Sequence, residues 1–277
     1  MTGAGGIDWL EVWRRMCAEA EGTSGAGPED DRWRERAARF DRVGRERPPD
    51  GVLDGLGNMV RPTDVVVDIG AGTGRHAAPL SRVCARLVAV EPSVAMRERL
   101  AARVAQERLE NVEIVADAWP MAGEGRRADV VFSSHVVYGV PAIGGFVRAM
   151  SACATRSCAL VLGLRAPADA LGELAVAVHG SARPRRPAAL EALAVLHQIG
   201  LRASLEVLQD TERSVSFDAG DEDVTEACRR LGVPTDADGR ARVREALRRF
   251  PTDESGQHLV GVAGPNAILR WVAPQTS

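Results

Sequence analysis

Short apolar runs alternate with stretches of helical periodicity along most of the chain, and this alternation is the feature that most constrains the fold. The runs show little polar alternation, which is typical of strands covered by helices on both faces. Strands that alternate with helices of about 10–15 residues predict βαβ units and a parallel sheet. The expected strands are residues 65–69, 87–90, 112–116, 129–133, 159–164, 201–208 and 266–272.

Two regions flank this alternating pattern. Residues 7–20 and 31–44 repeat apolar side chains at helical spacing, so residues 1–48 are expected to form an N-terminal helical arm or lid. The core is expected over residues 49–210, a helical insertion over 211–264, and the last strand of the core within 265–277. The arginines between positions 32 and 47 alternate with acidic residues, which favours a solvated helix face.

The basic residues exclude several enzyme classes. All 35 are arginine, so the chain has no P-loop lysine, no lysine for a Schiff base and no kinase-type lysine. The net charge of −3 gives no overall attraction for nucleic acid, which is not expected as a partner. The five cysteines form no C-x-x-C pair, and the five histidines lack zinc-ligand spacing, so no metal site is expected.

The sequence patterns predict neither a targeting signal nor a membrane span. The N-terminus lacks the basic start and apolar run of a signal peptide, and no stretch approaches the ~18 apolar residues of a membrane span. We therefore expect a cytoplasmic protein with no membrane partner. Its oligomeric state cannot be inferred from these patterns.

A glycine run follows the first expected strand. The segment reads Asp68-Ile-Gly70-Ala71-Gly72-Thr-Gly74, and glycines at alternate positions let a ligand approach the backbone closely. The dinucleotide fingerprint is G-x-G-x-x-G, so the third glycine here comes one position early. A carboxylate at Asp68 is also a poor neighbour for a pyrophosphate. It favours a ligand that carries an ammonium and a sulfonium.

Acidic residues end the next two strands. Glu91 can accept hydrogen bonds from both hydroxyls of a ribose, although an acid that begins the following helix is the alternative. Asp117 can accept from an adenine amino group or can simply form a turn. Trp119 can pack near a purine or in the core.

Together these motifs resemble the class I S-adenosylmethionine-dependent methyltransferases, most closely over residues 30–165. The resemblance implies a Rossmann-like, doubly wound α/β sheet of seven strands with the last strand antiparallel. It implies S-adenosylmethionine as cofactor and S-adenosylhomocysteine as product. The residues that it assigns to cofactor binding are Asp68, Gly70, Ala71, Gly72, Gly74, Glu91, Pro92, Asp117, Ala118, Trp119 and Ser134.

The segment after the fourth strand supplies the catalytic candidates, His135 and Tyr138. His135 is a base that can act near neutral pH, although many methyl transfers need none. Where many relatives have an aromatic residue followed by histidine, this chain has Tyr138-Gly139. Arg183, Arg185 and Arg186 form a loop cluster for which contact with an anionic substrate is one interpretation.

The sequence therefore predicts a methyltransferase that moves the sulfonium methyl by in-line displacement to an unidentified small-molecule acceptor. A cofactor-binding regulatory or assembly protein without catalysis is the first alternative. An NAD(P)-dependent oxidoreductase is the second, and the early third glycine and Asp68 argue against it.

Overall fold

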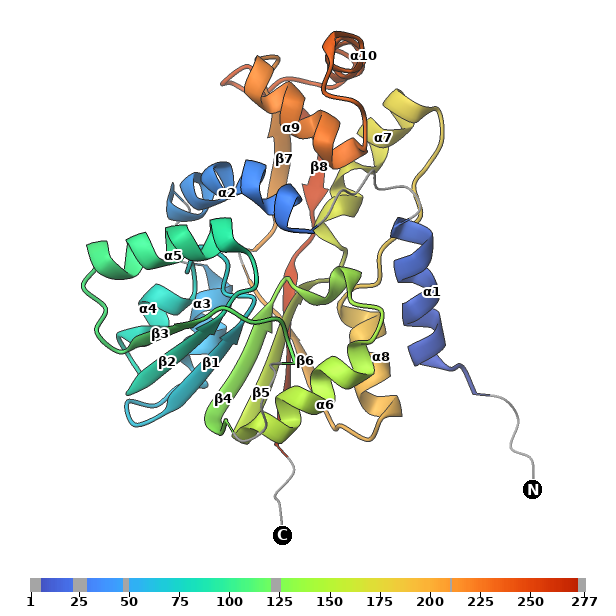
Figure 1. Cartoon of the computed structure of the whole chain (residues 1–277). Coiled ribbons are helices and arrows are strands. Elements are labelled where there is room, and N and C mark those ends of the chain that lie inside the picture. Colours follow the sequence, from blue (N-terminus) through green and yellow to red (C-terminus); the bar gives the residue numbers. More distant parts are fainter. Residues whose placement is uncertain (1–5, 22–28, 47–49, 121–125, 210, 274–277) are drawn as a thin grey trace.

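A mixed seven-stranded sheet forms the centre of the computed structural model, which describes residues 6–21, 29–46, 50–120, 126–209 and 211–273 (Figure 1). The strand order is β3-β2-β1-β4-β5-β9-β6. Neighbouring strands from β1 to β5 pair in parallel, whereas β9 runs antiparallel to both β5 and β6. The predicted seven-stranded sheet with an antiparallel last strand is confirmed. The strands are β1 (Val65–Ile69), β2 (Arg86–Val90), β3 (Val112–Val115), β4 (Ala128–Ser134), β5 (Ala154–Gly163), β6 (Ser204–Val207) and β9 (Asn266–Val272).

Helices cover both faces of this sheet because alternate side chains of its strands point to opposite sides. In β1, Val67 and Ile69 join the core under one set of helices, and Val66 joins the core under the other. The first set is α1 (Trp9–Glu21), α6 (Ile143–Cys153) and α8 (Ala189–Gln198), and the second is α3 (Gly51–Gly57), α4 (Ala77–Ser81) and α5 (Val94–Gln106). Within the described residues, none of the helices is both long and apolar enough to cross a membrane.

A second layer of elements stands beyond the carboxyl ends of the parallel strands (Figure 1). Its two-stranded sheet and three helices share a separate apolar core. These elements are α7 (Gly172–His179), β7 (Arg213–Phe217), α9 (Asp221–Leu231), α10 (Ala237–Leu247) and β8 (His258–Ala263). Helix α2 (Glu29–Glu46) and the single turns η1 (Val137–Gly139) and η2 (Pro167–Leu171) complete this end of the molecule.

The structure differs from the sequence-based expectation at three elements. After the glycine run the sequence predicts a helix from about Gly74 to Ala85, but the structure has only α4 there, because Gly74 has a φ of 86° that no α-helix contains. The insertion is not purely helical, since β7 and β8 pair antiparallel. Helix α3 was not predicted at all, although Asp50 accepts the N–H of Val52 as its N-cap.

Candidate active site

The glycine turn after β1 is shaped by close packing at two of its three glycines. Gly70, Gly72 and Gly74 have φ angles of 71°, 56° and 86°. A Cβ atom on Gly70 would lie 2.3 Å from Val136 Cγ2, and one on Gly74 would lie 2.5 Å from a methyl carbon of α5. At Gly72 the nearest atom, Phe40 Cε1, would be 3.6 Å away. The middle of the turn therefore faces helix α2 and has the most room.

Glu91 follows β2 and ties this turn to the neighbouring strand. Its Oε2 accepts the N–H of Gly72 at 2.8 Å, and its Oε1 accepts the N–H of Ser93 at 2.9 Å. The carboxylate is buried and fixed beside the turn, and Pro92 leads from it into α5. The structure thus brings Glu91 to the predicted place and gives it a structural bond there, while ribose binding stays a prediction.

Asp68 is the most unusual group of the site. Its side chain is 2% exposed, and Oδ2 has no hydrogen-bond partner among the described residues. Burial, and then the nearby Glu91, raise the pKa of Asp68 to about 8. A buried carboxyl without a donor is costly. A ligand ammonium would supply both the missing donor and a compensating charge, so this carboxyl fits the amino group of the cofactor that the sequence implies.

The residues after β3 are held by the protein itself. Asp117 Oδ1 accepts the N–H of Ala118 at 2.8 Å. Trp119 Nε1 donates to the carbonyl oxygen of Phe146 at 3.1 Å, and the two rings meet edge to face. This is the core packing that was the alternative interpretation of Trp119. The predicted contacts of these residues with an adenine stay predictions.

His135 and Tyr138 form a hydrogen-bonded pair after β4. His135 Nδ1 lies 2.9 Å from Tyr138 Oη, which accepts the N–H of Gly163 at 2.6 Å. His135 is exposed and has a φ of 60°, which is rare outside glycine, whereas Tyr138 is buried. Burial raises the pKa of Tyr138, so it remains a phenol at neutral pH. Tyr138 Oη can accept from His135 Nδ1–H as well, which makes Nε2 the basic nitrogen.

Ser134 adds a second buried oxygen at this edge. Its Oγ has no hydrogen-bond partner within the residues that the structure describes, as is also the case for Asp68 Oδ2. The two residues lie on adjacent strands, because β1 and β4 pair in parallel. A ligand bound at this edge of the sheet would supply hydrogen-bond partners to both atoms.

Helix α2 covers this edge and joins it to the insertion. Arg36 Nη2 lies 2.8 Å from Glu226 Oε1, Arg39 Nη1 contacts Asp223 Oδ1, and Arg42 Nη2 lies 2.6 Å from Glu222 Oε1. The first two arginines are half-buried. The expected solvated face is therefore wrong for these two positions, because three carboxylates of α9 lie within ion-pair distance of them. Helices α2 and α9 are neighbours in the fold (Figure 1). No local pattern reveals such a contact.

A second ion-pair group, also missed by sequence reasoning, centres on Asp50. Its Oδ2 accepts from Arg75 Nη2 at 2.6 Å and from Arg213 Nη2 at 2.8 Å. Burial alone would raise the pKa of Asp50, but the two guanidinium groups outweigh it and hold the pKa below its usual value. This carboxylate joins the end of the glycine turn to β7. Asp50 is an N-cap residue type, so the sequence signals a helix start here but not the two ion pairs.

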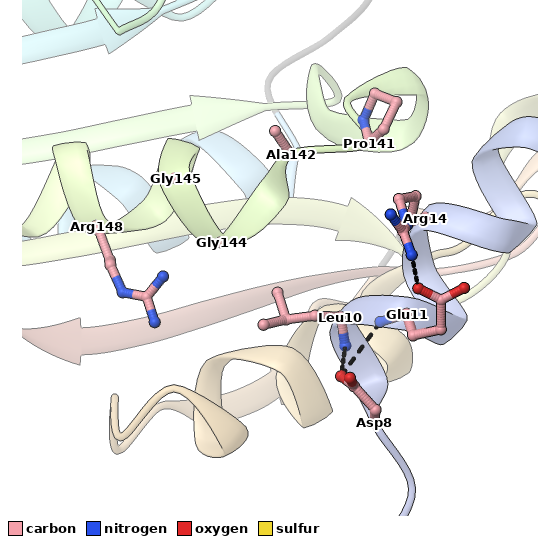
Figure 2. Close-up of a pocket in the computed structure, with 9 residues that line it drawn as sticks. All are labelled: Asp8, Leu10, Glu11, Arg14, Pro141, Ala142, Gly144, Gly145 and Arg148. Carbon is pink, nitrogen blue, oxygen red and sulfur yellow. Dashed lines mark hydrogen bonds and ion pairs between the residues drawn. The ribbon is translucent and has the colours of Figure 1, made fainter.

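A hollow of about 390 Å³ lies elsewhere, between α1 and the start of α6 (Figure 2). Arg14 pairs with Glu11 at its rim, and Leu10 and Gly144 meet on its floor. None of the residues predicted to bind cofactor lines it. Among the described residues, no three His, Cys, Asp or Glu side chains are grouped to hold a metal ion.

Residues 66–155 match a family model described as a methyltransferase domain. No curated protein sequence matches the chain. Among solved structures, the protein in complex with the Haloferax volcanii Trm112 methyltransferase activator is similar, with a TM-score of 0.57 and 17% identity over 90% of this chain and 99% of that one.

Two bacterial structures have the same fold. A protein of Bacillus halodurans C-125 assigned as a methyltransferase has a TM-score of 0.55 and 16% identity, covering 80% of this chain and 97% of that one. The YcgJ protein of Bacillus subtilis has a TM-score of 0.52 and 18% identity, covering 81% and 98%. Residues 66–155 therefore match a methyltransferase domain, and the chain as a whole has the fold of these solved structures.

Proposed function

We propose that this enzyme methylates a small molecule and that the buried edge around Asp68 holds the methyl donor. The observation that carries the proposal is the orphaned Asp68 Oδ2, enclosed beside a three-glycine turn. A cationic amino group there would turn an unsatisfied carboxyl into a charge-assisted pair. A diphosphate would meet a buried acid instead, which argues against a nicotinamide dinucleotide.

The other predicted cofactor residues are arranged around this carboxyl. Gly70, Ala71, Gly72 and Gly74 would lie along the methionine part of S-adenosylmethionine, and Glu91 with Pro92 would lie near its ribose. Asp117, Ala118 and Trp119 would hold the adenine from the end of β3. Ser134 Oγ would find a hydrogen-bond partner on the ligand, because it has none among the described protein atoms.

Bound S-adenosylmethionine supplies a methyl group already activated by its sulfonium, which an acceptor nucleophile takes in line as the carbon–sulfur bond breaks. The protein's task is to align the acceptor and to exclude water. His135 Nε2 takes the proton of an acceptor that arrives protonated. Tyr138 Oη then accepts from the Nδ1–H of the charged ring, which it already contacts at 2.9 Å.

The small size of the acceptor is supported by what surrounds the site. Helix α2 lies over the glycine turn and is paired with α9, so two helices cover the approach. The net charge of −3 does not favour a nucleic acid.

The test is release of S-adenosylhomocysteine from S-adenosylmethionine on addition of either a small-molecule cell extract or total RNA. We expect turnover only with the small molecules, and a loss of about 10²–10⁴-fold in kcat for His135→Gln, provided that the acceptor loses a proton. Turnover with RNA alone would overturn the small-molecule proposal. Tight cofactor binding without turnover in any extract would favour the non-catalytic alternative.

A further inference from the structure

One face of α9 presents three ionisable side chains toward α2. Asp223, Glu226 and Arg230 follow one another at intervals of three and four residues, so they lie along one side of the helix. Arg39 contacts Asp223, and Arg36 binds Glu226 Oε1 through both Nε and Nη2, at 3.2 and 2.8 Å. The two carboxylates of this face are therefore already paired with arginines of α2.

Arg230, the third member, has no such partner. In the part of the chain that the structure describes, no hydrogen bond or ion pair reaches its guanidinium group, which lies over the Phe217 ring at 5.7 Å. Burial lowers the pKa of Arg230 to about 10; the charge of Glu226 acts against this shift, whereas the charges of Arg36 and Arg39 add to it. At neutral pH the group still carries its charge. A charge in this position is expensive unless an anion compensates it.

The ring of Phe217 does not provide that compensation. A cation above an aromatic face gains less than a buried charge loses when its counter-ion is missing. The carboxylate of Glu226, whose charge acts on Arg230, is hydrogen-bonded to Arg36. Among the described residues, Arg230 therefore shares the charge of Glu226 with Arg36 and has no carboxylate bound to its own guanidinium group.

Arg230 also sits where the insertion meets the catalytic edge. Its carbonyl oxygen accepts from Arg183 Nη1 at 3.0 Å, in the loop between α7 and α8. In the same loop, Arg186 Nη1 would lie 3.8 Å from a Cβ atom on Gly139, the neighbour of Tyr138. The loop that carries Arg183 and Arg186 therefore joins the backbone at Arg230 to the neighbourhood of Tyr138, and it is basic.

We propose that Arg230 recognises an anionic group of the methyl acceptor, a carboxylate or a phosphate, between α2 and α9. The planar guanidinium fork matches either group with two parallel hydrogen bonds, and Phe217 offers an apolar surface beside it. The proposal rests on the proposed function, because it names the substrate class of that site. It makes Arg230 a specificity-determining residue.

The test uses the purified full chain loaded with S-adenosylhomocysteine and titrated at constant ionic strength with benzoate, benzamide or inorganic phosphate. Benzamide is the neutral counterpart of benzoate. We expect saturable binding of benzoate or phosphate, none of benzamide, and at least about tenfold weaker anion binding in Arg230→Gln. Arg230→Lys keeps the charge without the fork and is expected to lie between the two.

Arg229→Gln is the matched control, since Arg229 is the exposed neighbour on the same helix. It is expected to bind anions as the unchanged protein does. Equal anion binding by Arg230→Gln, or no saturable binding of either anion by the unchanged protein, would overturn the proposal. The affinity for S-adenosylhomocysteine is recorded in the same samples, so a failure of the cofactor site is seen separately.

Discussion

At the residue scale, the central feature of the proposed site is the buried carboxyl of Asp68, which the fold keeps without a hydrogen-bond donor among the described residues. Asp68 is enclosed by β1, β2 and β4, and the protein offers its Oδ2 no donor among the described residues. A residue that lowers the stability of the protein and lies at the carboxyl ends of the parallel strands is a candidate for ligand binding. The consequences of this carboxyl for stability and for binding can be measured separately.

Replacement of Asp68 by asparagine should stabilise the protein above neutral pH and should not do so at acidic pH. The pKa of Asp68 in the folded protein is raised to about 8, so the folded state holds its proton more tightly than the unfolded state. The resulting stability is complete below the ordinary pKa of about 3.9 and is lost as the pH rises to about 8. We expect Asp68→Asn to gain on the order of 2 kcal/mol at pH 8 by urea unfolding. A constant difference between pH 5 and pH 8 would show that Asp68 is charged throughout.

The three glycines of the turn should respond unequally to alanine. A Cβ atom on Gly70 would meet Val136 Cγ2 at 2.3 Å, so Gly70→Ala combines a strained φ with a clash. We expect a loss of about 3 kcal/mol of unfolding free energy. Gly72→Ala has only the strained φ and should lose about 1 kcal/mol. Thermal unfolding measures both, and equal losses would contradict the packing described here.

At the element scale, helix α2 connects the cofactor edge to the insertion. Phe40 lies over Gly72, while Arg36 and Arg39 bind α9. Sequence patterns predicted α2 itself and its place before the sheet. They did not predict its partners, because Arg36 and Glu226 are 190 residues apart and helical periodicity reports only the contacts of a single helix.

The same limit explains the other differences. The alternating apolar runs were sufficient to predict the sheet, since each strand shows its burial within a few residues. The pairing of β7 with β8 was missed because the paired residues Phe217 and His258 are 41 residues apart and most side chains of both strands are half-buried or exposed. The sequence predicted the glycine turn and the Asp68 carboxyl before it. It did not predict the hydrogen bond from the N–H of Gly72 to Glu91, because the two residues are on different strand ends and meet only in the folded structure.

The half-buried pair of Arg39 and Asp223 should couple α2 to α9 more strongly than an exposed pair does. A double-mutant cycle with Arg39→Ala and Asp223→Ala is expected to give a coupling of about 1–2 kcal/mol in urea unfolding. The more exposed pair of Arg42 and Glu222 serves as the control and should give about 0.5 kcal/mol or less. A larger coupling energy for Arg42 and Glu222 than for Arg39 and Asp223 would contradict this prediction.

At the scale of the whole molecule, the structure has two layers with separate apolar cores. The sheet and its two sets of helices carry the glycine turn, Asp68 and Glu91. The other layer consists of α7, α9, α10, β7 and β8 and has a core of its own. The second layer stands over the carboxyl ends of the strands, where ligands of open α/β sheets bind (Figure 1). We expect the first layer to bind the methyl donor. The second layer is where acceptor specificity is expected.

The most direct measurement is a calorimetric titration of the purified chain with S-adenosylhomocysteine, with NADH as the comparison ligand. We expect the chain to bind S-adenosylhomocysteine at one site and not to bind NADH. We also expect at least about tenfold weaker binding in Asp68→Ala and in Glu91→Ala. Asp54→Ala, which removes an exposed carboxylate of α3, should bind as the unchanged protein does. Binding of NADH instead, or unchanged affinity in Asp68→Ala, would contradict the assignment of this edge as the methyl-donor site.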